Sequence, residues 1–311
     1  MANTINKASS AALHTTVQNY YDGKLLMEME KRLVYYQGGQ RRSLPKGSGR
    51  VAEFWRYEPF DAVTTALTEG VVPDGQTLSM SKVTAEVKAY GGYVATTDVL
   101  DLTGVNTQTN QLVHLMARQG ALSVDHIVRD VIFGGTNAMY CGKKAARDAV
   151  TAADKLTSKE LRKAVKALKK NHAQTFGGYY IAIVGPDTMY DLQEDEAFIK
   201  VSQYQDKENI YTGEVGRLFG VRLVETTEAK IFEGKGASGA DVASVIVLGK
   251  YAYGITSLKG SKPSVIVKPA GSAGTADPLD QISTVGWKMD GFGVKMLQPE
   301  YAVRIECGFS A

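Results

Sequence analysis

The segment "KVTAEVKAYGGYVATTDVLDLT", residues 82–103, decides the fold of this 311-residue chain. Small apolar residues at positions 83, 85, 87 and 89 alternate with polar residues at 82, 84, 86 and 88. This period of two predicts a strand with one buried face and one wet face. Gly91 and Gly92 then predict a break, after which "YVATTDVLDL" resumes the strand. The segment therefore predicts one long strand that is interrupted once.

A second strand is predicted just upstream, at "RVAEFWRYEPF", residues 50–60. The polar stretch "TEGVVPDGQTLSMS" separates the two strands and contains a turn signal at Pro73-Asp74-Gly75. Together these pieces predict a long β-hairpin with a polar tip. Because an isolated hairpin is only marginally stable in water, we expect it to pack against another surface, and another subunit is one candidate.

A long helix is predicted downstream, at "TQTNQLVHLMARQGALSVDHIVRDVIFGG", residues 107–135. Asn106 or Thr107 can cap its start, and Gly134-Gly135 ends it. About 28 helical residues make a rod of roughly 40 Å, which suits the spine of an elongated molecule. One apolar stripe is predicted to comprise Leu112, Leu115, Met116, Gln119, Leu122, Ile127, Val131 and Ile132.

The remaining chain contains three segments with different sequence patterns. Residues 37–50, "QGGQRRSLPKGSGR", predict a flexible, basic and exposed segment. Residues 136–261 alternate helices with short apolar strands such as "YYIAIV", which predicts an α+β or α/β unit with its own core. Residues 262–311 predict strands and turns, ending in the strand "YAVRIECGF".

Bulk composition limits the possible functions. A chain with 44% hydrophobic and 22% charged residues is globular, and a net charge of +3 is too small for a dedicated nucleic-acid binder. No apolar run is long enough to span a bilayer, so no membrane partner is expected. Cys141 and Cys307 form no C-x-x-C motif and the four histidines lack metal spacing, so we expect no metal and no cofactor.

Two stretches carry weak signs of chemistry. "GEVGRLFGVRLVETTE", residues 213–228, has three glycines that could cradle a phosphate, but they precede a β-rich run instead of opening a helix. A loop that enters a strand is the favoured interpretation. "VDHIVRD" brings Asp125, His126, Arg129 and Asp130 together, and we expect a helical ion pair between Asp125 and Arg129 in preference to a catalytic acid–base pair.

A lysine-rich helix is predicted at "KLTSKELRKAVKALKKNH", residues 155–172. Its apolar positions fill one face, so its basic residues occupy the other. The favoured interpretation is a solvated face, and the alternative is weak, sequence-independent contact with phosphates.

The order of these pieces resembles the major capsid proteins of tailed bacteriophages, which have the Johnson, or HK-ninety-seven-type, fold. The resemblance covers residue 20 to the end. Residues 67–103 are similar to the family's extended loop, the E-loop, where it runs into the spine helix. "GEVGRLFGVRLVETTEA" and "IVLGKYAYGI" are similar to passages of its A domain, and "STVGWKMDGFGVKMLQPEYAVRIECGFSA" is similar to the closing strand of its P domain.

The resemblance implies an α+β fold with four parts. These are an N-terminal arm (1–45), a β-hairpin E-loop (46–104), a P domain with the spine helix (105–140 and 262–311) and an inserted A domain (141–261). It also implies an assembly interface on the arm and hairpin, for which the candidates are Arg41, Arg42, Arg50, Trp55, Arg56, Pro73, Asp74, Lys82 and Lys88.

The function implied by the resemblance is a non-enzymatic shell subunit. Copies would form the pentamers and hexamers of an icosahedral head that encloses the phage DNA, assembled in the bacterial cytoplasm and found in the virion. Implied partners are further copies, a portal, packaged double-stranded DNA through weak contacts and, in some relatives, a decoration protein. Because the arm begins close to Met1, we expect a separate scaffolding protein and no large maturation cleavage. The alternatives are a cellular nanocompartment shell with this fold and a nucleotide-using enzyme built on residues 136–261.

Overall fold

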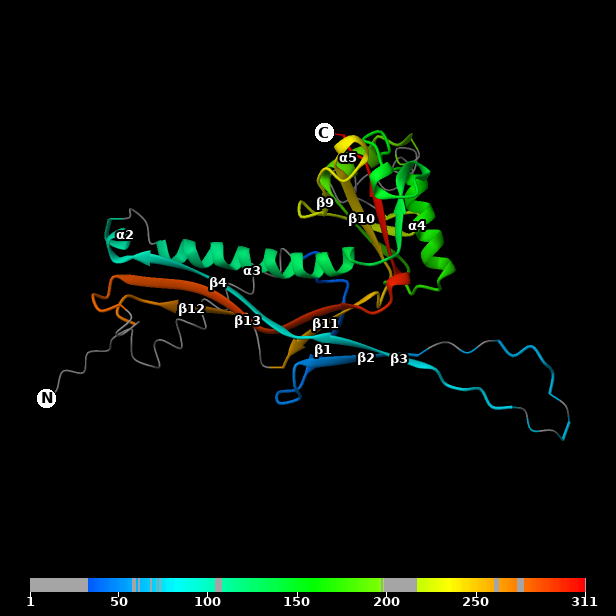
Figure 1. Ribbon diagram of the computed structural model, residues 1–311, viewed down its shortest axis with the longest axis horizontal. Helices are drawn as coiled ribbons and strands as arrows, with labels where there is room; N and C mark the ends of the chain where they lie inside the picture. The colour runs from blue at the N-terminus through cyan, green and yellow to red at the C-terminus, as the bar shows by residue number, and fades with distance from the viewer. Residues whose placement is uncertain are drawn as a thin grey trace.

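The computed structural model describes residues 33–310, except 58–59, 61, 68, 71, 73, 104–107, 197, 199–216, 260–262 and 273–276. The described part is elongated (Figure 1). A long sheet and a long helix run side by side along the molecule, a second sheet with shorter helices stands at one end, and a hairpin projects beyond that end. Most of the predicted N-terminal arm, up to residue 32, lies outside the described residues.

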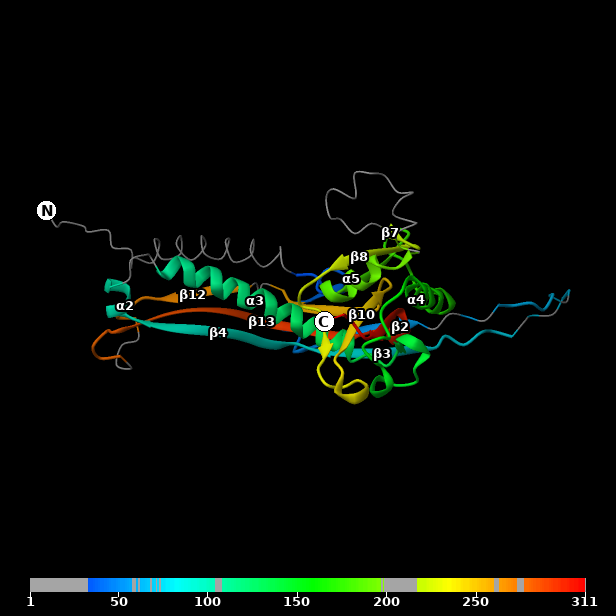
Figure 2. The same cartoon turned by 90° about the horizontal axis from the view of Figure 1, so that it is seen from above.

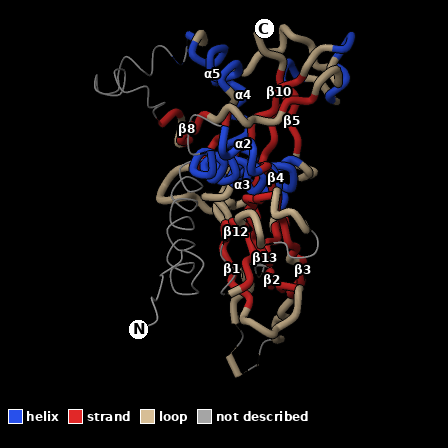
Figure 3. Tube along the Cα trace, turned by 90° about the vertical axis from the view of Figure 1, so that its left-hand side faces the viewer, coloured by secondary structure: helices blue, strands red, loops and turns tan. Residues whose placement is uncertain are grey.

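The long sheet has five strands in the order β1-β11-β13-β12, with β4 also paired to β13. The fifteen-residue strand β13 is central and pairs antiparallel with β4, β11 and β12. Strand bounds are β1 Gln40–Leu44, β4 Lys88–Thr97, β11 Tyr253–Leu258, β12 Ser264–Lys268 and β13 Ile282–Met296. Seen along the long axis, helix α3 lies between this sheet and the second sheet (Figure 3).

Helix α3, Gln108–Phe133, is the predicted spine. Its buried face runs at spacings of three and four residues, through Val113, Met116, Ala117, Gly120, Ala121, Val124, Val128 and Ile132. The predicted stripe was therefore wrong in part, since Leu115 is 57% exposed and the buried face is centred on small residues. Small side chains let the helix approach the sheet closely.

Gly91 and Gly92 do not break the strand, contrary to the prediction, because both lie inside the continuous strand β4. A β-carbon on Gly92 would lie 2.9 Å from Gln119 Oε1 on α3, and one on Gly91 would lie 2.7 Å from the Trp287 carbonyl oxygen on β13. The glycines are required by close packing. Strand β4 ends at Thr97, and Asp98–Thr103 forms the short helix α2 where the sequence predicted more strand.

The second sheet has seven strands, in the order β5-β14-β10-β6-β8-β7 with β9 paired to β10. Their bounds are β5 Ala138–Tyr140, β6 Tyr180–Val184, β7 Arg217–Leu218, β8 Val221–Glu225, β9 Ile231–Phe232, β10 Val242–Leu248 and β14 Ala302–Cys307. Helices α4 (Ser158–Lys170) and α5 (Pro186–Gln193) contribute apolar residues to its core. Strand β14, near the end of the chain, lies in this second sheet, whereas β11 lies in the long sheet.

The hairpin is confirmed by strands β2 (Val51–Tyr57) and β3 (Met80–Glu86), which pair antiparallel from Val51 opposite Glu86 to Tyr57 opposite Met80. Its base has a small core of its own, made of Leu44, Ala52, Phe54, Ala85 and Val87. Val83, Ala85 and Val87 face inward as predicted, whereas Ala89 is exposed. Beyond β2 and β3 the described residues extend away from the body (Figures 1 and 2).

Residues 40–44 were predicted to be flexible but form strand β1, which pairs in parallel with β11. The preceding Gly39 has no room for a side chain, since its β-carbon would lie 2.6 Å from Ile255 Cδ1. The side chains of residues 40–43 are nevertheless exposed, as predicted. The basic segment is thus held in a fixed backbone position at the edge of the long sheet.

Candidate assembly interface

The base of the hairpin, here called the hairpin root (residues 40–57 and 80–88), gathers basic and aromatic side chains. The guanidinium of Arg42 lies 5.8 Å from the Phe54 ring centroid and donates to the Glu53 carbonyl oxygen. The ammonium of Lys82 lies 5.8 Å from the Trp55 ring and pairs with the Glu53 carboxylate. Cations over aromatic faces contribute about 0.5–1 kcal/mol each at exposed sites. These contacts stabilise the observed positions of Arg42 and Lys82.

A concave site, the root pocket, opens beside these residues with a volume of about 300 Å³. Its walls are aromatic, apolar, amide and cationic, and the two charged groups that line it are Arg42 and Arg56. The lining residues are Gln40, Arg42, Phe54, Trp55, Arg56, Tyr57, Val83, Tyr251, Leu297 and Gln298. Such a pocket can take an apolar side chain next to a carboxylate.

The outer part of the hairpin, here called the distal hairpin (residues 58–79), exposes large apolar groups. Val72 is 90% exposed and the others are more than half exposed. These residues are Phe60, Val63, Leu67, Val72 and Leu78. Monomeric proteins rarely leave so many large apolar side chains of one short segment in water, so the distal hairpin has the character of a contact surface.

The structure brings some of the predicted interface residues together and separates others. Arg42, Trp55 and Arg56 line one pocket, and Lys82 contacts Trp55. Arg41 lies over Tyr36, with its guanidinium 4.8 Å from the ring centroid.

The other predicted residues lie elsewhere. Arg50 is exposed just before β2, Lys88 is exposed at the start of β4, and Asp74 is exposed in the distal hairpin. Pro73 lies outside the described residues. The predicted set is therefore distributed over a root and a distal part, and is not one cluster.

Sequence reasoning missed the apolar half of this surface. It named none of the exposed apolar residues of the distal hairpin, although five large apolar residues between positions 60 and 78, two of them in the stretch predicted to be polar, were a usable signal. It also missed Tyr251 and Leu297, which reach the pocket from distant parts of the chain. A local sequence pattern cannot predict contacts between residues that are so far apart in the chain.

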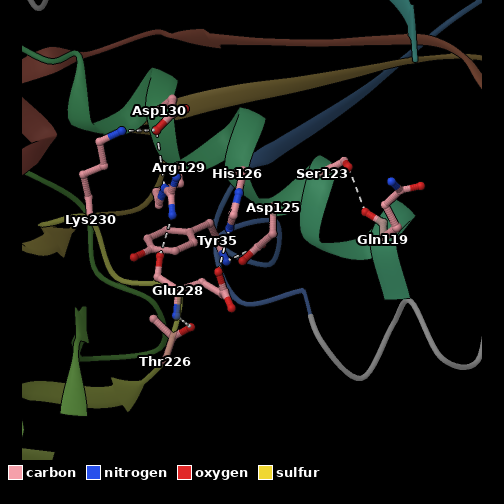
Figure 4. Close-up of polar contacts among 10 residues, drawn as sticks. All are labelled: Tyr35, Gln119, Ser123, Asp125, His126, Arg129, Asp130, Thr226, Glu228 and Lys230. Atoms are coloured by element: carbon pink, nitrogen blue, oxygen red, sulfur yellow. Dashed lines mark hydrogen bonds and ion pairs between the residues drawn. The ribbon is translucent and has the colours of Figure 1, made fainter. Parts of the chain in front are cut away.

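A second polar cluster joins α3 to two other segments (Figure 4). The buried carboxylate of Asp125 accepts the backbone N–H groups of Tyr35, at 2.9 Å, and Tyr36, at 3.2 Å. Burial raises the pKa of Asp125 to about 6, although these N–H groups and nearby His126 act in the opposite direction. The segment before β1 is thereby attached to the spine helix.

The same face of α3 also contacts the loop between strands β8 and β9 of the second sheet. His126 Nε2 lies 2.7 Å from Glu228 Oε2, and Arg129 Nη1 donates to the Glu228 carbonyl oxygen at 2.9 Å. Lys230 Nζ donates to Asp130 at 3.1 Å. The expected Asp125–Arg129 ion pair was therefore wrong, because Asp125 accepts backbone groups and Arg129 reaches the loop. Asp125 thus connects the spine helix to the segment before β1, and His126, Arg129 and Asp130 connect it to the loop after β8.

Other predicted signals have structural explanations. In the described part of the glycine-rich stretch, Leu218 and Val221 flank a tight turn in which Gly220 has a φ of +79°. Strand β8 follows directly, which confirms the loop entering a strand. Within the described ranges, no group of three metal-ligating side chains occurs. No described helix is long and apolar enough to cross a membrane.

Solved phage shells have the same fold. The structure is similar to the capsid of the cyanophage P-SCSP1u at 17% identity, with a TM-score of 0.69 and 89% of each chain covered. It is similar to the capsid of Ralstonia phage GP4 at 12% identity and a TM-score of 0.70, covering 90% of this chain and 92% of that one. For the cyanophage Pam1 capsid the identity is 16% and the TM-score 0.67, with 90% and 93% covered.

This is the α+β fold of phage shell subunits, which confirms the predicted fold class. The sequence family described as phage capsid protein matches residues 81–305, and the chain belongs to that family. The protein is accordingly a major capsid protein, a structural subunit and not an enzyme. No curated protein matches the chain in sequence.

Proposed function

We propose that copies of this chain assemble as pentamers and hexamers into an icosahedral head that encloses a double-stranded DNA genome. The assembly takes place in the cytoplasm of the host bacterium and involves a portal, a separate scaffolding protein and, where one exists, a decoration protein. The observation that carries the proposal is the projecting hairpin, whose apolar residues have no partner surface among the described residues of the same copy.

Such a shell is stabilised by many weak contacts between subunits that act together. Each hairpin contributes a limited area, but once a ring has begun to close every further contact is nearly intramolecular. The proposed contact residues are Arg41, Arg42, Arg50, Trp55, Arg56, Pro73, Asp74, Lys82 and Lys88. Apart from Pro73, which lies outside the described residues, their positions on the root and on the distal hairpin suit contact with a neighbour.

Weak contact with the packaged DNA is proposed for the exposed face of α4. Lys159, Lys166, Lys169 and Lys170 are exposed along this helix, and no ion-pair partner for them occurs among the described residues. A row of exposed lysines can neutralise phosphates without recognising a base sequence.

Shortening the hairpin tests the proposed assembly role. Replacing residues 60–78 by a short Gly-Ser linker keeps β2, β3 and the root core, so the subunit should fold and stay soluble. We expect this variant to form no closed particles by negative-stain electron microscopy. Closed particles of normal size from the shortened chain would contradict an assembly role for the hairpin.

A further inference from the structure

The two cysteines of the chain, which are far apart in the sequence, are neighbours in the second sheet. Strand β14 pairs in parallel with β5, and the last pair of this register is Glu306 opposite Tyr140. Cys307 and Cys141 are the next residues along the two strands. Both are fully buried, and both are free thiols. The fold therefore places two reduced thiols side by side in its core.

The side chains of the two cysteines point to the same side of the sheet. Alternate residues of a strand face one side, and Ile305 and Cys307 of β14 both belong to the core to which α4 and α5 contribute. Cys141 belongs to the same core. Hydrogen bonding to the Cys141 thiol, followed by burial, raises the pKa of the Cys307 thiol well above its usual range. The two sulfur atoms are thus close enough to interact.

The spacing of the two strands suits a disulfide bond. Neighbouring strands of a sheet lie about 4.7–4.9 Å apart. Cysteines that are joined by a disulfide have Cα atoms about 4.4–6.8 Å apart. A bond between Cys141 and Cys307 is therefore compatible with the observed pairing of β5 and β14.

The position of β5 decides which thiol a dissolved reagent reaches first. Strand β5 has only three residues and lies at the edge of the seven-stranded sheet, whereas β14 lies between β5 and β10. Short edge elements open locally at a lower free-energy cost than the middle of a sheet. Opening of β5 uncovers Cys141, while Cys307 stays against β10, where its thiol donates to the Ala243 carbonyl oxygen at 3.8 Å. Cys141 is therefore the more accessible thiol.

We propose that Cys141 and Cys307 form a redox-convertible pair, a dithiol in reducing surroundings and a disulfide in oxidising ones, with Cys141 as the attacking thiol. The oxidant is a small disulfide such as glutathione disulfide. The Cys141 thiolate attacks one sulfur of the oxidant, which releases one reduced glutathione and leaves a mixed disulfide. The Cys307 thiolate then attacks the Cys141 sulfur and displaces the second glutathione. The two cysteines lose two electrons and two protons, and the two released glutathione thiols take up both.

The surroundings of the chain would set the time of this conversion. A reducing cytoplasm keeps the pair as a dithiol while the chain folds and assembles, and an oxidising medium outside the cell favours the bond. This timing rests on the proposed function, whereas the thiol chemistry does not. The bond would close the long loop between residues 141 and 307, so it would stabilise the folded chain chiefly by restricting the unfolded one.

Incubation of the purified, reduced full-length chain with glutathione disulfide tests the pair. Samples are then unfolded, alkylated to label the remaining thiols, digested and analysed by mass spectrometry. The wild type is compared with Cys141→Ala, Cys307→Ala and the double variant, each checked for folding by circular dichroism. The wild-type result stands by itself if a variant does not fold.

We expect the wild type to contain a Cys141–Cys307 disulfide and to retain no glutathione. Cys307→Ala should retain one glutathione on Cys141. Cys141→Ala should react at least about tenfold more slowly, because its remaining thiol lies behind the edge strand. The oxidised wild type should melt about 5 °C higher than the reduced wild type, and the double variant should show no such difference.

Three results would overturn the proposal. Folded wild type that keeps two free thiols after prolonged exposure is one. Glutathione that stays on Cys141 without transfer to Cys307 is the second, because it shows that the two sulfur atoms cannot meet. Faster reaction at Cys307 than at Cys141 is the third, because it reverses the assigned order. None of these measurements requires particles, so their failure would leave the proposed shell function standing.

Discussion

The indole N–H of Trp287 on β13 donates to Gln119 Oε1 on α3 at 3.1 Å, next to Gly92 of β4. The Trp287 ring also lies against Gly120, where an added β-carbon would be 3.1 Å from the ring. One buried tryptophan thus joins the spine helix to the long sheet, and Gly92 and Gly120 make the room for it.

This contact predicts a large and local stability effect. Trp287→Ala should lower the free energy of unfolding by about 3–5 kcal/mol, because it removes a large buried ring and leaves a cavity. Gly120→Val should cost about 1–3 kcal/mol by overpacking the same site. Tyr93→Ala, on β4 but 76% exposed, is the control and should change stability little. Chemical denaturation of unassembled subunits measures all three, and equal losses for Trp287→Ala and Tyr93→Ala would contradict the packing argument.

Substitutions at two adjacent aromatic residues on β2 should have different effects, one on folding and the other on assembly. Phe54 is buried in the root core, whereas Trp55 is 46% exposed at the pocket. We expect Phe54→Ala to destabilise the subunit by about 3 kcal/mol or more. Trp55→Ala should leave the melting temperature nearly unchanged but lower particle yield. Thermal unfolding and particle counting distinguish the two, and a Trp55→Ala chain that assembles normally would remove Trp55 from the interface.

Asp125 predicts a specific pH dependence of subunit stability. Its pKa is raised from 3.8 to about 6, so the folded state binds a proton more tightly than the unfolded chain. Stability should therefore fall as pH rises through this window, by up to about 3 kcal/mol for this group alone. Asp125→Asn keeps an oxygen that can accept the Tyr35 and Tyr36 N–H groups and removes the titration.

Denaturation curves between pH 4 and pH 7 check this, by comparing the wild type with the Asn variant. The difference in unfolding free energy between the two should change with pH between about 3.8 and about 6 and level off above that window. A constant difference across that range would show that Asp125 titrates normally. Asp125→Ala should instead cost stability at every pH, because two buried N–H groups lose their acceptor.

Glu306 on β14 should be among the most sensitive charged positions. Its carboxylate is fully buried and accepts from Arg147 Nε at 2.6 Å and from Arg304 Nε at 2.7 Å. Glu306→Ala leaves both guanidinium groups without their carboxylate and should cost about 3–5 kcal/mol. Glu300→Ala, an exposed residue shortly before the same strand, is the matched control. A cost below about 1 kcal/mol for Glu306→Ala would mean that water replaces the carboxylate.

The lysine stripe of α4 predicts salt-sensitive DNA binding. Replacing Lys159, Lys166, Lys169 and Lys170 by Gln should weaken binding to random duplex DNA and flatten its dependence on salt concentration. The slope of log affinity against log salt should fall by about 0.9 for each phosphate that the variant no longer neutralises. Unchanged affinity and slope, measured by fluorescence anisotropy, would leave α4 as a solvated surface only.

The sequence predicted those elements whose patterns are local. Alternation in residues 82–88 indicated the inner face of β3, and the length and apolar content of residues 108–133 indicated the spine helix. Gly91 and Gly92 were misjudged because their role depends on Trp287 and Gln119, which are distant in sequence. Strand β1 was missed for the same reason, since its partner β11 lies more than two hundred residues further along the chain.

The candidate interface was predictable to a similar degree. Arg42, Trp55 and Arg56 were named from the sequence and share one pocket, but Tyr251 and Leu297 could be found only once the chain had folded. Helical spacing predicted an ion pair between Asp125 and Arg129. In the structure the buried Asp125 carboxylate instead accepts the backbone N–H groups of Tyr35 and Tyr36. Helical spacing describes isolated helices, whereas the partners of a buried side chain are decided by what packs against the helix.

The central claim, that this chain is a shell subunit built by ring-like contacts, is tested most directly by electron microscopy of the full-length protein at high concentration. We predict closed particles, or rings of five and six copies, with the hairpin of each copy lying on its neighbour. Correctly folded protein that stays a homogeneous population of monomers or two-fold dimers, both alone and together with the phage's scaffolding protein, would contradict the claim.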